Sequence, residues 1–125
     1  LDDDIELFID PSGKRGWNYY QLIFNPRGTT FDIYMKGRKD PDKSWEPKYL
    51  HKVHVGKDHW ILELALPWNC FDRTEKSDVR WSLNVVHVRS VGEVLYWSPV
   101  MSTEAHTPWF FGFLKGMPAR ELKGK

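Results

Sequence analysis

Aromatic side chains are the most abundant groups in this sequence that could bind a ligand. Seven Trp, seven Phe and five Tyr make up 15% of the 125 residues. Exposed rings stack on flat ligands such as sugars, nucleobases and cationic groups. Trp97 and Trp109 flank a closing loop, so we predict an aromatic platform there with Arg89 and His106 as polar partners. Core packing is the alternative for every ring, and we expect it for three tryptophans within or against predicted strands: Trp60, Trp68 and Trp81.

Two groups of residues carry side chains of the kind that binds metal ions: Asp2, Asp3, Asp4 and Asp10, and His51, His54 and His59. The four aspartates offer the hard oxygen ligands that Ca²⁺ takes, but they lack the spacing of an EF-hand loop. A calcium site and a solvated acidic strand end are therefore both open interpretations. His51 and His54 are three residues apart, which places them on opposite faces of a strand and argues against a zinc site.

The composition and motifs favour a binding domain over an enzyme. The sequence contains no nucleophile elbow, phosphate-binding glycine loop or His-Glu-x-x-His helix. Cys70 is the single cysteine, so no internal disulfide forms. The 18 basic and 17 acidic residues are interleaved, which argues against nucleic acid or anionic lipid as a partner. No apolar run approaches the roughly 18 residues of a membrane-spanning helix.

Alternation of apolar and polar residues dominates the chain and predicts strands. We expect them at 3–10, 18–25, 29–36, 49–55, 59–66, 79–89, 94–97 and 111–114. The first three form an antiparallel meander, 37–47 is a surface loop, and 68–75 holds one short helical turn. These elements predict an all-β antiparallel sandwich, immunoglobulin-like or jelly-roll-like, over residues 1–115. Residues 116–125 are expected to be a frayed tail.

Five phrases, in order, resemble the family 9 carbohydrate-binding modules and the wider group of DOMON-like sandwich domains. They are Asp3–Asp10, Tyr19–Pro26, Trp60–Trp68, Trp81–Asn84, and Tyr96–Pro99 with His106–Gly112. The resemblance implies a slot where two tryptophans clamp a terminal sugar ring. Glu6 and Asn25 match its acidic and amide positions. Ile23, Val86 and Ala105 replace its arginine, its glutamine and its second clamping tryptophan.

Members of that family usually carry further strands ahead of the acidic motif, whereas Leu1 here begins on it. The first clamping tryptophan would likewise precede Leu1. Either a separate or removed segment, or a partner chain, supplies the missing N-terminal strands, or the chain is a fragment. In each case the incomplete sandwich leaves sheet edges to be covered.

The function expected from the resemblance is non-catalytic carbohydrate binding by ring stacking and hydrogen bonding. Such a module is attached to or associated with a polysaccharide-active system, with any glycoside hydrolase activity in another domain or chain, at the cell surface or outside the cell. Two alternatives remain open. One is a DOMON-like haem domain, for which Met35, Met101, His54 and His87 are the available axial ligands. The other is an interaction or structural domain whose sugar site has been lost.

Overall fold

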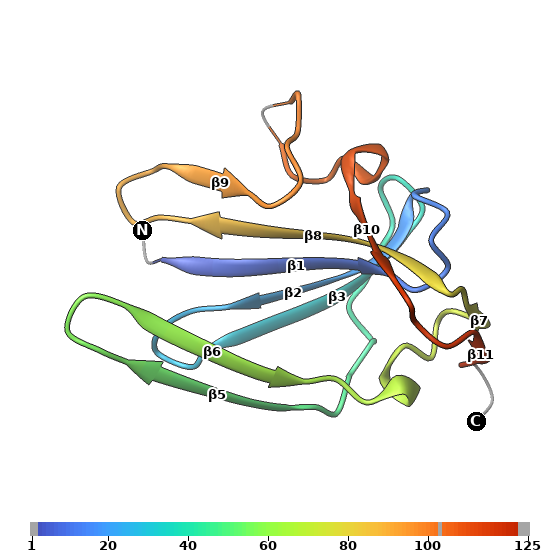
Figure 1. Ribbon diagram of the computed structural model, residues 1–125, viewed down its shortest axis with the longest axis horizontal. Helices are drawn as coiled ribbons and strands as arrows, with labels where there is room; N and C mark the ends of the chain where they lie inside the picture. Colours follow the sequence, from blue (N-terminus) through green and yellow to red (C-terminus); the bar gives the residue numbers. More distant parts are fainter. Residues whose placement is uncertain (1–2, 103, 123–125) are drawn as a thin grey trace.

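The alternating segments form a large antiparallel sheet in the computed structural model, which describes residues 3–102 and 104–122 (Figure 1). The strand order is β10-β8-β1-β2-β3-β4, and β9 pairs with the other end of β8. The strands are β1 (Asp4–Asp10), β2 (Asn18–Phe24), β3 (Thr30–Lys36), β4 (Pro41–Asp42), β8 (Arg80–Val88), β9 (Val94–Tyr96) and β10 (Gly112–Lys115). The neighbouring β1, β2 and β3 confirm the predicted meander.

A hairpin of two strands forms a smaller second layer against the large sheet. It consists of β5 (Leu50–Val55) and β6 (Trp60–Ala65). The remaining elements are the single-turn 3₁₀ helices η1 (Trp68–Cys70) and η2 (Pro108–Phe110), and the short pair β7 (Lys76–Ser77) and β11 (Arg120–Glu121). The protein is thus an all-β, sandwich-like domain, as the sequence predicted, but with two layers of unequal width.

Each face of the large sheet has its own apolar cluster because successive strand residues point to opposite faces. On the hairpin-side face, Leu7 and Ile9 of β1 belong to a cluster with Leu22 and Phe24 of β2, packed under β5 and β6. On the opposite, loop-side face, the cluster consists of Phe8, Tyr19, Val86 and Phe111. Part of its cover comes from Tyr96 and Ala105, at the end of β9 and in the segment that follows it.

Two segments differ from the sequence-based expectation. The loop 37–47 contributes the short strand β4, and its Trp45 is only 1% exposed within the hairpin-side cluster. The tail does not fray as predicted over its described part, because Leu122 is 2% exposed and its N–H donates to the Glu75 carbonyl at 2.7 Å. Both differences have the same cause, which is a large apolar side chain that a distant part of the chain can bury.

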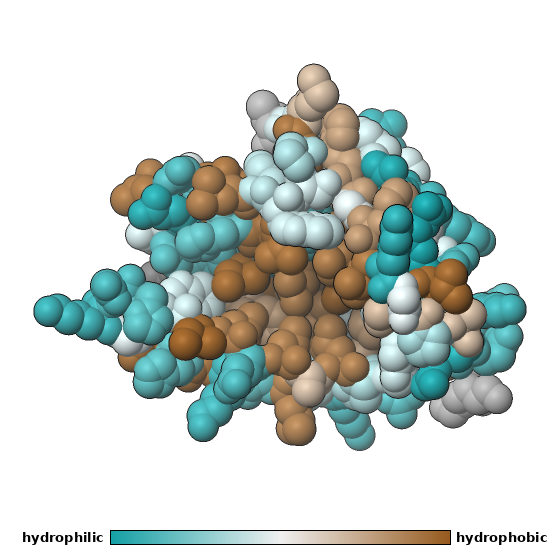
Figure 2. Space-filling model, in the orientation of Figure 1, coloured by the Kyte–Doolittle hydropathy of each residue, from teal (hydrophilic) through white to brown (hydrophobic). Residues whose placement is uncertain are grey.

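The hairpin covers only part of its face of the sheet. Tyr49 and His51, just before and on β5, contact the Phe24 ring on β2, so the hairpin lies toward the β2–β3 side. In Figure 1, β8 and β9 lie to one side of the hairpin, above it in this view. Figure 2, in the same orientation, shows a hydrophobic area in the middle of this side of the molecule. We call the uncovered part of this face, over β9, β10 and the adjoining residues of β8, the open strip; Trp68 and Phe71 cover Trp81 at the start of β8.

Candidate functional site

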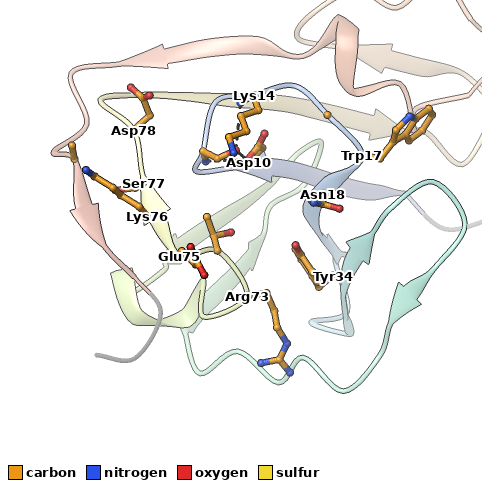
Figure 3. A pocket seen from close by; sticks show the side chains of 14 residues that line it. Asp10, Lys14, Trp17, Asn18, Tyr34, Arg73, Glu75, Lys76, Ser77 and Asp78 are labelled. Carbon is orange, nitrogen blue, oxygen red and sulfur yellow. Dashed lines mark hydrogen bonds between the residues drawn. The ribbon is translucent and has the colours of Figure 1, made fainter.

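An open pocket lies where β1 ends, β2 begins and β3 ends (Figure 3). Its volume is about 620 Å³, within the range of pockets that bind small ligands. Four separate parts of the chain line it: residues between 10 and 18, Tyr34, residues 73–78, and Ala119. We call it the Trp17 pocket, after the only tryptophan among its lining residues.

One wall of the Trp17 pocket is a loop held by a single buried carboxylate. Asp10 Oδ1 accepts hydrogen bonds from the Ser12 backbone N–H at 2.9 Å and the Ser12 hydroxyl at 2.6 Å. Asp10 Oδ2 accepts from the Arg15 N–H at 3.2 Å and the Ser82 hydroxyl at 3.4 Å. Because these donors occupy both oxygens, Asp10 fixes the shape of the wall and leaves ligand contacts to its neighbours.

The opposite wall is fastened by Arg73 and by the Tyr20 hydroxyl. The guanidinium of Arg73 donates to Asp42 Oδ2 and Asp72 Oδ1, both at 3.2 Å, and its pKa is raised, mainly by the Asp42 hydrogen bond. In Figure 3 this guanidinium is turned away from the middle of the pocket. The Tyr20 hydroxyl accepts from the Arg73 N–H at 3.0 Å and bonds the Thr74 hydroxyl at 2.9 Å. These bonds tie segment 73–78 to Tyr20 on β2 and to Asp42 on β4.

Tyr34 and Glu75 are among the polar side chains left to meet a ligand, together with the lysines Lys14 and Lys76. Among the described residues, none forms a hydrogen bond with the Tyr34 hydroxyl or the Glu75 carboxylate. Burial raises the pKa of Tyr34, with a further contribution from the Asp10 charge, so this hydroxyl stays protonated as a donor at neutral pH. Figure 3 shows both side chains at the pocket, on segments from different parts of the chain.

Trp17 supplies the aromatic part of the pocket and is held on two sides. Its ring meets the ring of Trp109 edge-on, with centroids 5.1 Å apart. The guanidinium of Arg38 lies 5.4 Å from its ring centre, within the range of a cation–π contact. Trp17 is thus a fixed, partly buried ring beside a polar hollow.

Glu6 and His106, two of the predicted site residues, both lie on the loop-side face. Glu6 accepts a hydrogen bond from Gln21 Nε2 at 2.9 Å, and burial raises its pKa. His106 Nδ1 is 2.6 Å from the Tyr19 hydroxyl, and its ring packs edge-on against Phe8. Burial lowers the pKa of His106. These side chains are engaged with the sheet, outside the Trp17 pocket.

Asn25 and Arg89 occupy turns. Asn25 Oδ1 accepts hydrogen bonds from the N–H groups of Arg27 and Thr29, both at 3.0 Å, which is the capping role open to an asparagine before a Pro-Arg-Gly turn. Arg89 donates from Nη1 to Glu93 Oε2 at 2.5 Å across the β8–β9 turn.

Trp97 and Trp109 lie on opposite faces of the large sheet. Trp97 is two residues after Leu95, so the two side chains point to the same face of the sheet. The indole of Trp97 lies over Gly112: a Cβ added to this glycine would be 2.6 Å from the ring. This is the hairpin-side face, since Gly112 pairs with Leu83. Trp109 packs instead against Trp17, which belongs to the loop-side cluster. The two tryptophans therefore offer two separate surfaces, each about half exposed.

The structure also separates the residues considered for metals and haem. Asp3 accepts a hydrogen bond from the Ser90 N–H at the start of β1, whereas Asp10 lies at its end, and Asp2 is outside the described residues. Within the described ranges, no group of three or more His, Cys, Asp or Glu side chains could hold a metal ion. Of the haem candidates, His87 is on the hairpin-side face, Met35 is in the loop-side cluster, and His54 is on β5. Met101 is 89% exposed.

The chain matches no known family model, and no curated protein or solved structure is significantly similar to it. In the part of the chain that is described, no helix has the length and apolar character needed to cross a membrane. The Trp17 pocket escaped the sequence analysis because its walls are far apart in the sequence. The one local signal was Asp10-Pro11-Ser12-Gly13, which is typical of a structured turn.

Proposed function

We propose that the protein is a non-catalytic carbohydrate-binding domain and that the Trp17 pocket takes a sugar. The observation that carries the proposal is an aromatic ring beside a preformed polar pocket, with the Tyr34 hydroxyl and the Glu75 carboxylate free of partners among the described residues. Sugars present apolar ring faces and outward hydroxyls, so an indole and a few fixed polar groups are their natural complement.

The pocket is shaped before a ligand arrives. Hydrogen bonds of Asp10, Arg73 and Tyr20 already hold the pocket walls in place, so binding requires little ordering of the backbone. Preorganisation of this kind reduces the entropic cost of association. The sequence resemblance to family 9 modules supports the same ligand class, and also a role at the cell surface or outside the cell.

The test is a glycan array followed by calorimetry on the glycans that bind. Tyr34→Phe removes one hydroxyl and keeps the ring, and Glu75→Gln removes one charge. Tyr34→Phe deletes one hydrogen bond to the ligand, and Glu75→Gln weakens another by removing the charge of its acceptor, so we expect each change to weaken binding by about 3- to 10-fold. We expect Trp17→Ala to lower affinity further because it removes the stacking surface.

Trp97→Ala is the control, since Trp97 lies on the hairpin-side face away from the pocket. Affinity should be unchanged in this variant. Full binding by Tyr34→Phe and Glu75→Gln, with loss in Trp97→Ala, would move the site to the Trp97 surface. A folded protein that binds no glycan on the array would contradict the proposed function itself.

A further inference from the structure

Two arginine side chains lie over the ring of Phe113 on β10. The Cζ atom of Arg80 is 4.1 Å from the ring centroid, and that of Arg15 is 5.0 Å from it. Phe113 is directly opposite Ser82 on β8, which is on the same face as Val86 of the loop-side cluster. The ring and its two arginines are therefore on the loop-side face, on the other side of the sheet from the open strip.

The backbone holds Arg15 in place beside this ring. Arg15 is the only non-glycine residue in the described ranges with a left-handed backbone conformation, at φ 57°. Its N–H donates to Asp10 Oδ2 at 3.2 Å, and the Ser82 hydroxyl donates to the same oxygen at 3.4 Å. Arg15 is thereby tied to the residue that pairs with Phe113. A left-handed conformation is unfavourable for a residue with a side chain, and such residues concentrate at ligand-binding sites.

Neither guanidinium has a carboxylate partner. Among the described residues, none forms an ion pair or a hydrogen bond with the guanidinium of Arg15 or Arg80. Asp78 accepts a hydrogen bond from the Arg80 backbone N–H only. Lys115 is directly opposite Arg80 and shares its face, so a third positive charge borders the ring. The two distances to the shared centroid place the Cζ atoms at most about 9 Å apart, close to one Debye length at physiological salt, so their repulsion is only partly screened.

The contact with Phe113 leaves hydrogen-bond donors of both guanidiniums available. A guanidinium has five N–H donors that point outward in one plane, so a single aromatic ring occupies at most part of them. A phosphate or sulfate group accepts paired hydrogen bonds from such a fork, with its central atom about 4 Å from Cζ. One group between two forks thus spans Cζ atoms up to about 8 Å apart, close to the limit that the shared ring sets. Arg80 is exposed, so its long side chain can close the small difference.

We propose that Arg15 and Arg80, with Lys115 beside them, bind a tetrahedral oxyanion, namely a phosphate or sulfate group, next to Phe113. The two forks supply paired hydrogen bonds, and the three positive charges suit the two negative charges of a phosphate or sulfate ion. A carboxylate has two acceptor oxygens, which one guanidinium already satisfies, so it would leave the second guanidinium without a partner. The oxyanion is either a free ion or an ester on a larger molecule, because both present the same acceptor oxygens.

The test is an NMR titration of the intact chain with inorganic phosphate and, separately, with glucose 6-phosphate, at pH 7.5 and constant ionic strength. Amide signals of 13–16, 80–82 and 112–115 should shift and saturate at millimolar concentrations. Arg15→Gln and Arg80→Gln should each weaken binding about tenfold, because each removes a charged pair of hydrogen bonds. Arg15→Lys and Arg80→Lys keep the charge but lose the fork, so they should also weaken it.

The two phosphates, with glucose as a third probe, separate the possible sources of the oxyanion. Tighter binding of glucose 6-phosphate than of inorganic phosphate, with no shift of the same signals by glucose, identifies an ester group as the ligand. Equal affinities for the two phosphates identify the free ion. Both results support the site.

Arg120→Gln is the matched control. The guanidinium of Arg120 also lies over an aromatic ring, that of Trp68, at 4.8 Å from its centroid, but in the described part of the chain no second guanidinium shares that ring. The affinity for phosphate should be unchanged in this variant. Circular dichroism verifies that all variants remain folded. Shifts that do not saturate, an equal loss in Arg120→Gln, or full binding by both glutamine variants at 15 and 80 would overturn the proposal and leave only a nonspecific effect of charge.

Discussion

Replacement of Trp45 measures how firmly the loop 37–47 is anchored in the hairpin-side cluster. The Trp45 ring lies 4.6 Å from that of Tyr20, and its Nε1 donates to the Cys70 carbonyl at 2.7 Å. Trp45→Ala leaves a large cavity, so we expect the free energy of unfolding to fall by about 3–5 kcal/mol. Trp45→Phe retains most of the ring but loses the hydrogen bond, with an expected loss of about 1–3 kcal/mol.

Urea denaturation followed by far-UV circular dichroism measures both losses. With a urea slope of about 1.5 kcal/mol/M, the midpoint for Trp45→Ala should fall by about 2 M or more. Trp109→Ala is the control, since that ring is 47% exposed, and it should cost about 1 kcal/mol or less. A loss below about 0.5 kcal/mol for Trp45→Ala, typical of a surface change, would refute the anchoring of this loop.

Three further predictions follow from local geometry. Gly13→Ala places a Cβ against the Arg80 carbonyl oxygen at a positive φ and should cost several times the roughly 1 kcal/mol expected for Gly28→Ala, whose positive φ faces open space. Equal unfolding midpoints for the two variants would contradict this. Burial raises the pKa of the Cys70 thiol to about 12, so iodoacetamide should label Cys70 at pH 8 only as fast as the protein unfolds. Labelling as fast as that of a denatured sample would show an accessible thiolate instead. Burial lowers the pKa of His106, so below its ordinary value of 6.5 the unfolded chain binds more protons and the free energy of unfolding falls as pH decreases. An NMR titration midpoint at or above 6.5, or an unchanged pH dependence in His106→Gln, would count against it.

The strands were predictable from sequence because their pattern is local. Over 3–10 the alternation places Ile5, Leu7 and Ile9 on one face of a strand and Phe8 on the other, and Leu7, Ile9 and Phe8 lie in the two clusters accordingly. The capping role of Asn25 likewise follows from its place directly before the Pro-Arg-Gly turn. In each case the residues that decide the structure are neighbours in the chain, so alternation and turn chemistry suffice.

Local sequence patterns could not predict which loop residues are buried or what shape the pocket has. Trp45 sits in a polar, proline-interrupted segment, and only contact with Tyr20 and Cys70 makes it a core residue. The Trp17 pocket similarly needs Tyr34 and Glu75 from distant segments. The separation of Trp97 from Trp109 depends on strand register, which a short strand such as β9 does not reveal in its sequence.

The central position of β1 affects the order in which the protein assembles. β1 pairs with β2, its neighbour in the chain, and also with β8, which is distant in the sequence. For example, Asp10 of β1 lies opposite Ser82 of β8. Long-range strand pairing is slow, because distant segments must meet before their contacts contribute. During synthesis at about 5–20 residues per second, β1 therefore waits several seconds with one edge bare before β8 leaves the ribosome. The nascent meander is exposed to aggregation in this interval, and the arrival of β8 covers that edge.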